Sequence, residues 1–464
     1  MATEQKHERE SRFLLPILIV VGILCFRLTA WTLFRGQLAL ILTDSYVLSH
    51  GAQIASVLVL VAVVSALKPS LRWRAPAIVV AALLMAASAA WIVFPAAVIR
   101  ADVVRVACMV HGAASAVIFI GWGAVTCRHR PQMTAVCVMI AFLLDSMIAG
   151  VLDSMPVLVP ALSVITPLIA GGLLVLVLLR FQDSLPDETL AFFTKSVMRS
   201  LPWGLLAFLF LCSLMVTISS VLAPVETLSR QFSVNNFWTP IFLTALAAAL
   251  FLFRVKKRER SDGLWILFSF IMFCGLVAFS SLSLVDYSLA LGFMRATQDC
   301  LFMFSWILVA DIAYHHRLPA VPFFGLCAIF VMMPEPVPAA ILGMVLAPVP
   351  LSAQGPLSVT IALIMAVVLV AFTLVLLQRQ ARGEAVSQWH DSHLAQRVEE
   401  LTRTFGFTDR ESEVAELLLQ GYSMPQISER LFISLDTVRT HMRHIYQKAG
   451  VHSKVELIEL SKKP

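Results

Sequence analysis

The sequence predicts an all-α protein that combines a polytopic membrane helix bundle with a small C-terminal domain of four short helices. Of its 464 residues, 59% are hydrophobic and only 14% are charged, and the mean hydropathy is +0.84. This composition excludes an ordinary soluble protein. The end of the chain differs, because helix-start signals recur there among polar residues from Phe407 to Leu460.

The bundle is expected over residues 13–378, where apolar windows long enough to cross about 30 Å of hydrocarbon recur. Twelve spans are predicted, at 13–35, 46–67, 75–97, 103–126, 133–153, 156–179, 201–223, 237–254, 263–284, 288–312, 320–345 and 356–378. Basic residues concentrate in alternate connections, such as those at 68–74 and 254–260. The positive-inside rule therefore places these loops, the tail at 1–12 and the C-terminus in the cytoplasm.

A longer polar segment near 180–200 separates six predicted spans from the next six. This layout resembles the six-plus-six arrangement of the major facilitator superfamily. Between the second and third spans the chain reads ALKPSLRWRAP, which keeps the basic character of that family's loop motif but lacks its Gly-Asp pair. The departure argues against transport activity.

Charged residues inside the spans are the candidates for a ligand site, since a charge at a helix centre costs roughly 2.5–3.5 kcal/mol on insertion scales and is usually retained for a purpose. They are Arg27, Arg105, Asp145, Arg295, Asp299 and Asp311, together with the ionisable His111, and the first five are the residues predicted to contact the ligand. The facilitator resemblance implies that the first, fourth, seventh and tenth spans line a central cavity, and a surplus of arginine there favours an anionic small molecule. Alternatively, Arg295 and Asp299 neutralise each other on one helix face, and Arg105 snorkels from a span end.

A connector of residues 379–404 follows the last span. It is polar, rich in helix formers and free of proline. A semi-rigid helix is therefore expected to lead into the domain at 405–464.

Four caps predict the four helices of that domain. Thr408 and Glu411, Ser423 and Gln426, and Ser453 and Glu456 have the spacing of a reciprocal capping box, and Ser434 supplies the remaining cap. Gly421 and Gly450 stand where a left-handed residue would end the first and third helices. The apolar residues expected to form the core are Val414, Leu417, Leu418, Ile427, Leu431, Val438, Met442, Ile445, Leu457, Ile458 and Leu460.

These residues resemble the LuxR-type (GerE-type) helix-turn-helix of bacterial transcription regulators. The matching positions are Thr408, Glu411, Val414, Gly421, Ile427, Leu431, Ile433, Ser434, Thr437, Val438, Arg439, His441, Ile445, Lys448, Gly450 and Val451. Met424-Pro425 departs from the family's pattern and removes a lysine that would contact phosphate. Proline is tolerated there because a first-turn N–H has no helical partner.

The resemblance implies that the third helix enters the major groove of double-stranded DNA. The residues expected at the interface are Asp436, Thr437, Arg439, Thr440, Arg443, His444, Lys448 and Lys454. Arg439, Thr440 and Arg443 suit base edges, whereas His444, Lys448 and Lys454 are better placed for phosphates. The alternative is a solvated surface, because positive and negative residues nearly cancel from Leu401 onward. Because the net charge of the domain is near zero, a single copy is expected to bind DNA only modestly. A homodimer is therefore expected, and the resemblance implies that it pairs through the fourth helix.

Together these features predict a membrane-embedded one-component transcription regulator in the inner membrane of a bacterium. Its partners would be DNA, membrane lipid and an unidentified small molecule. The alternatives are a facilitator-type transporter with a fused DNA-binding tail and a membrane scaffold with a vestigial tail. The eight cysteines fall singly, without metal-ligand spacing, and no catalytic motif stands out. We therefore expect no cofactor, no metal and no enzymatic activity.

Overall fold

The structure is a computed structural model of the whole chain. It describes residues 2–33, 43–67, 71–93, 101–181, 203–221, 241, 264–282, 287–315, 318–329, 351–419, 423–431 and 433–460. The chain divides into two compact units, Met1–Thr373 and Leu374–Pro464. Across the described ranges the regular elements are helices, without a strand.

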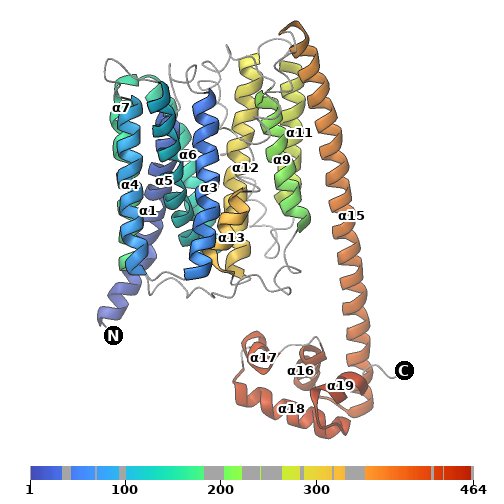
Figure 1. Cartoon of the computed structure of the whole chain (residues 1–464). Helices are drawn as coiled ribbons and strands as arrows, with labels where there is room; N and C mark the ends of the chain where they lie inside the picture. The colour runs from blue at the N-terminus through green and yellow to red at the C-terminus, as the bar shows by residue number, and fades with distance from the viewer. Residues whose placement is uncertain are drawn as a thin grey trace. The chain divides into compact units, whose positions relative to one another are not determined.

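The first unit is a bundle whose helices run side by side (Figure 1). Its elements are α1 (Ala2–Leu33), α3 (Thr43–Leu67), α4 (Leu71–Val93), α5 (Ala101–Arg128), α6 (Pro131–Asp153), η1 (Pro156–Leu158), α7 (Val159–Arg180), α9 (Trp203–Val221), α11 (Leu264–Leu282), α12 (Tyr287–His315), α13 (Ala320–Cys327) and the first part of α15 (Leu351–Phe405). The predicted window 237–254, apart from residue 241, and most of 320–345 lie outside the described residues. The other predicted windows each coincide with one of these helices.

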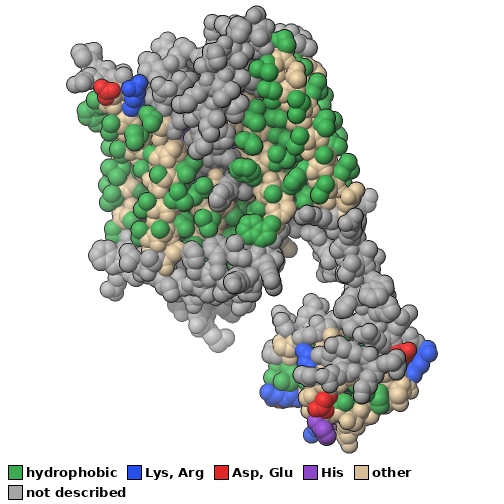
Figure 2. Space-filling model, turned by 45° about the vertical axis from the view of Figure 1, so that its right-hand side comes forward, with side chains coloured by type: hydrophobic (Ala, Val, Ile, Leu, Met, Phe, Trp, Pro, Cys, Tyr) green, Lys and Arg blue, Asp and Glu red, His purple; other side chains and the backbone are tan. Residues whose placement is uncertain are grey.

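Seven helices among the described residues are long and apolar enough to cross a membrane. Their apolar stretches are Leu48–Ser65, Arg74–Val93, Asp102–Arg128, Pro131–Leu152, Val159–Arg180, Gly292–Tyr314 and Val359–Gln378, and shorter ones lie in α1, α9 and α11. Large hydrophobic side chains such as Val59, Trp91 and Val367 are more than half exposed. Figure 2 shows the described atoms of the visible face of this unit to be mainly hydrophobic. Such a surface suits lipid contact and indicates a multi-pass membrane protein.

The interior of this unit is aromatic where α5, α12 and α13 meet. Phe119 and Trp306 pack edge to face with ring centroids 5.2 Å apart, and Phe324 lies 5.3 Å from both rings. The indole N–H of Trp306 donates to Thr126 Oγ1 at 2.9 Å, which satisfies a buried donor. These contacts fix α12 against α5.

The close packing of α7 against α4 depends on Gly171 of α7. A Cβ built at this position would lie 2.5 Å from the Cβ of Ala82 on α4, whereas a Cβ at Gly172 would meet nothing within 4 Å. Because Ala82 Cβ cannot move without its backbone, Gly171→Ala is expected to force α4 and α7 apart. Overpacking of this kind costs about 1–3 kcal/mol.

Thermal unfolding of the full-length protein in detergent checks this expectation. Gly171→Ala is expected to lower Tm by several degrees, and the matched control Gly172→Ala to leave Tm unchanged or slightly higher, since alanine is the better helix former. Equal Tm values for the two variants would contradict the packing argument.

The second unit carries four short helices on a core of its own: α16 (Asp409–Leu419), α17 (Met424–Leu431), α18 (Leu435–Ala449) and α19 (Lys454–Leu460). The residues buried in that core include Val414, Leu418, Ile427, Val438, Ile445 and Leu457. Leu417, Leu431, Met442 and Leu460 are partly buried against them. The side chain of Ile458 lies outside the described residues.

Three of the four predicted caps form, at Thr408, Ser434 and Ser453, and the last of them differs in one bond. The backbone N–H of Thr408 donates to Glu411 Oε2 at 2.8 Å and that of Glu411 to Thr408 Oγ1 at 3.4 Å, and Ser434 Oγ accepts from the N–H of Thr437 at 3.1 Å. In the last helix, Ser453 Oγ accepts from Glu456 N at 3.1 Å as predicted.

The difference lies in the return bond of that last cap. The Glu456 carboxylate accepts from the N–H of His452 at 2.8 Å, one residue before the predicted donor. Gly450 ends α18 with φ +66°, in the left-handed conformation that glycine adopts without a Cβ clash. Gly421 and the side chain of Gln426 lie outside the described residues.

Candidate functional site

Three of the five residues predicted to contact a ligand in the membrane unit come together. Arg27 of α1 donates from Nε to Asp145 Oδ2 of α6 at 2.8 Å, and from Nη2 to Asp299 Oδ1 of α12 at 3.2 Å. The side chains of Arg27, Asp145 and Asp299 are 15%, 7% and 27% exposed. One guanidinium thus joins two carboxylates from different helices.

Aromatic rings complete this cluster. The Arg27 guanidinium carbon lies 3.8 Å from the centroid of the Phe142 ring and 5.7 Å from that of Phe302. Trp306 packs edge-on against both rings, with centroids 6.5 and 5.9 Å away. The flat cation therefore lies between negative charge and ring faces, where cation–π attraction adds to the ion pairs.

The other two predicted residues are placed differently. Arg105 is half exposed near the start of α5, where it lies 3.6 Å from Asp102 of the same helix. The side chain of Arg295 lies outside the described residues, and Asp299 pairs with Arg27 of another helix. Within the described part of the chain, no group of three His, Cys, Asp or Glu side chains has the arrangement of a metal site.

In the second unit, α18 presents one face to the core and the other to solvent. Val438 and Ile445 are completely buried, while Asp436, Arg439 and Arg443 are exposed. Thr440 is also exposed, and Thr437 is half-buried with its Oγ1 2.8 Å from the capping Ser434 Oγ. The predicted base-reading residues therefore lie on the face that Val438 and Ile445 leave open.

Asp436 organises the first turn of this exposed face. Its Oδ1 accepts from Arg439 Nη1 at 2.8 Å, and its carbonyl accepts from the hydroxyl of Thr440 at 3.0 Å. Because a surface ion pair contributes only about 0–1 kcal/mol, Arg439 can exchange Asp436 for a stronger acceptor. The second bond turns the Thr440 hydroxyl toward its own helix.

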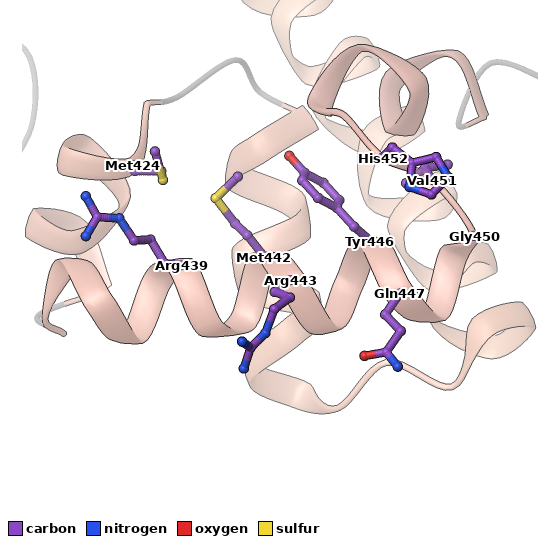
Figure 3. Close-up of a pocket in the computed structure, with 9 residues that line it drawn as sticks. All are labelled: Met424, Arg439, Met442, Arg443, Tyr446, Gln447, Gly450, Val451 and His452. Atoms are coloured by element: carbon purple, nitrogen blue, oxygen red, sulfur yellow. The ribbon is translucent and has the colours of Figure 1, made fainter.

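A shallow groove of about 740 Å³ runs along α18. Figure 3 shows Met424 and Arg439 at one end and Val451 and His452 at the other, with Met442 and Tyr446 on one side of the helix and Arg443 and Gln447 on the other. Burial raises the pKa of the Tyr446 phenol, so it stays protonated and can donate a hydrogen bond near neutral pH.

Two residues predicted to contact phosphate lie beside a buried carboxylate. Lys448 Nζ donates to Glu411 Oε2 at 2.6 Å and to the carbonyl of Gly406 at 2.9 Å, and His444 Nδ1 lies 3.7 Å from Glu411 Oε1. Burial alone would raise the pKa of Glu411, but hydrogen bonds from Lys448 and Thr408 outweigh it and hold the pKa below its usual value. Lys448 therefore stabilises the domain. A phosphate contact would have to share its ammonium with Glu411.

Residues 406–461 match the family model described as bacterial regulatory proteins, luxR family (GerE). These residues form a LuxR-type helix-turn-helix domain. Its helix-turn-helix is α17 and α18. The predicted all-α fold, with a membrane bundle before a helix-turn-helix, is confirmed.

Curated relatives match a short stretch of this chain. The HTH-type transcriptional regulator MalT of Yersinia pestis (strain Pestoides F) is 42% identical over 62 residues, which are 13% of this chain and 7% of MalT. The MalT protein of Serratia proteamaculans (strain 568) matches with the same identity and coverage. The chain thus spans only a small fraction of the length of these relatives.

Solved transporter structures align with most of this chain. A bacterial homologue of the iron transporter ferroportin, in an outward-facing state with soaked iron, aligns with 77% of this chain and 99% of its own at 12% identity and a TM-score of 0.50. The major facilitator superfamily transporter FucP, in its outward conformation, aligns with 78% and 98% at 12% identity and a TM-score of 0.48. At such low identity, the likeness to the ferroportin homologue concerns the fold alone.

Sequence reasoning missed two features of these sites. Capping spacing predicted the Thr408–Glu411 bonds but not the contact from Lys448, which is 37 residues away. It also left out Met424, Tyr446 and Gln447, which line the groove along α18. Their neighbours in space come from chain folding, and no local pattern marks them.

Proposed function

We propose that this protein is a membrane-embedded one-component transcription regulator. The membrane domain at 13–378 senses a small molecule, the connector at 379–404 transmits its state, and the domain at 405–464 binds double-stranded DNA as a homodimer. One observation carries the proposal: a single chain joins a multi-pass membrane unit to a LuxR-type domain.

The mode of DNA binding follows from the exposed face of α18. Arg439 and Arg443 address guanine edges, Thr440 offers its methyl group to thymine, and Asp436 and Thr437 lie at the base-facing end of the helix. His444, Lys448 and Lys454 contact phosphates and set the register. Because this small surface has few cations, two copies of the domain are needed for tight binding.

Sensing requires a membrane domain with two conformations that bind the ligand unequally, since a ligand without such a preference shifts no equilibrium. The buried charges on α1, α6 and α12 support this role, because charges inside a membrane are costly unless they serve a function. The charged loops support a bacterial inner-membrane protein, surrounded by lipid, with both termini in the cytoplasm.

The test is genome-wide crosslinking of DNA to the full-length protein in intact cells, beside a chain truncated after residue 404. Discrete peaks are expected for the full chain, and they should vanish in the truncated chain while the membrane fraction still contains it. Peaks that persist after truncation, or a full chain without peaks in every growth condition, would contradict the proposal.

A transporter with a fused DNA-binding tail is the second candidate, favoured by the transporter fold of the membrane unit. Uptake into proteoliposomes separates the two. Accumulation of a genuine ligand driven by an ion gradient supports transport, whereas binding without accumulation supports a sensor.

A further inference from the structure

We propose that the side chains around the Arg27 guanidinium form a binding site for small organic cations. Arg27 fills this site when no ligand is bound, and the ligand sensed by the membrane unit is such a cation. The inference rests on the proposed sensing function and names its ligand class. It differs from the anionic ligand that the sequence predicted.

The surroundings of the Arg27 guanidinium have the chemistry of an organic-cation site. Asp145 and Asp299 accept its N–H groups at 2.8 and 3.2 Å, and the Phe142 ring lies against its carbon at 3.8 Å. Carboxylates supply charge-assisted hydrogen bonds, and ring faces attract flat cations that have lost part of their hydration. A ligand with a guanidinium or ammonium group can use the same partners.

One acceptor in the cluster is unused. Asp145 Oδ1 is buried without a hydrogen-bond partner among the described residues, while Oδ2 of the same carboxylate holds Arg27. A buried acceptor without a donor is unfavourable, so the site gains when a further N–H group arrives. Arg27 satisfies only one oxygen of Asp145, so a ligand N–H group can reach the other oxygen without displacing that bond.

The two ion pairs of Arg27 differ in length and in burial. Its bond to Asp299 is longer than its bond to Asp145, and the Asp299 side chain is 27% exposed against 7% for Asp145. Asp299 is therefore the carboxylate that an arriving cation takes over, together with the unused oxygen of Asp145. The exchange breaks the link from α1 to α12. It gives the membrane unit two alternative arrangements, one held by Arg27 and one held by the ligand.

Benzylguanidinium is a suitable probe because benzylurea has nearly the same shape without the charge. Full-length protein in detergent is titrated with benzylguanidinium, benzylurea or the anion phenylpropanoate, and Tm and calorimetric binding are measured. Of the three compounds, only benzylguanidinium is expected to bind, and it should raise Tm more as its concentration increases. Binding of benzylurea with equal affinity, or of phenylpropanoate alone, would overturn the proposal.

Substitutions locate the site. Asp145→Asn and the less buried Asp299→Asn are expected to weaken benzylguanidinium about tenfold or more, because each loses a charge-assisted hydrogen bond. Asp102→Asn is the control, since Asp102 is an exposed carboxylate beside Arg105 at a helix end, and should leave affinity unchanged. Arg27→Met removes the resident cation and should tighten binding.

If Arg27→Met binds the probe no more tightly than wild type, or if Asp102→Asn weakens it as much as Asp299→Asn, the proposal is wrong. These assays measure probe binding by the membrane unit in the absence of DNA. Probe binding without crosslinked DNA peaks would refute the regulator alone, and peaks without probe binding would refute the cation site alone.

Discussion

Replacing Arg439 and Arg443 together with alanine is expected to weaken DNA binding by roughly 100-fold or more. Each arginine that contacts a guanine edge through two bonds contributes about 1–3 kcal/mol of discrimination, and the two contributions combine. Both side chains are exposed on the face of α18 that points away from the core. The measurement is fluorescence anisotropy, with the full-length protein in detergent and DNA from a crosslinked peak.

Arg410→Ala is the matched control for that experiment. Arg410 is an exposed arginine of the same domain, on α16, and pairs with Glu413 at 2.6 Å just as Arg439 pairs with Asp436. It should change affinity little, and its salt dependence should equal that of wild type. If the double variant binds the operator as tightly as Arg410→Ala does, α18 does not contact the bases through these two arginines.

Local chemistry made the C-terminal domain predictable. Caps at Thr408, Ser434 and Ser453 form bonds within four residues, and the burial of Val438 and Ile445 follows from helical spacing. Such signals depend on neighbours in sequence, which the sequence itself displays. For the same reason the starts of α16, α18 and α19 were predictable without any tertiary contact.

The membrane site was predictable in composition but not in its pairing. Charges inside apolar spans singled out Arg27, Asp145 and Asp299, because each needs a partner in hydrocarbon. Which partner each residue takes depends on how the helices pack, and Arg27 bonds to residues 118 and 272 positions away. Spacing along one helix suggested Arg295 as a partner of Asp299, and it gave no sign of the bond that Asp299 makes to Arg27 on another helix.

Replacing Glu411 with alanine is expected to destabilise the LuxR-type domain by about 2 kcal/mol. The carboxylate is almost completely buried and accepts bonds from Lys448 and from the backbone of Thr408. A net hydrogen bond to a charged group contributes about 1.5–3 kcal/mol, and the value is discounted because Lys448 is 35% exposed. Thermal unfolding of a fragment of residues 374–464, the whole second unit with its own core, should show Tm lower by about 8–15 °C.

The pH dependence of that difference separates the ionised carboxylate from mere packing. Since the folded domain lowers the pKa of Glu411, its contribution is complete above the ordinary glutamate pKa of about 4.3 and is lost as pH falls through the folded value. The Tm difference between wild type and Glu411→Ala should therefore shrink in acid. Glu413→Ala, which removes an exposed carboxylate paired with Arg410 on the same helix, should cost less than about 0.5 kcal/mol. A Glu411 effect that is equal at pH 7 and pH 3 would mean that the side chain stabilises the domain by filling space, without the ion pair to Lys448.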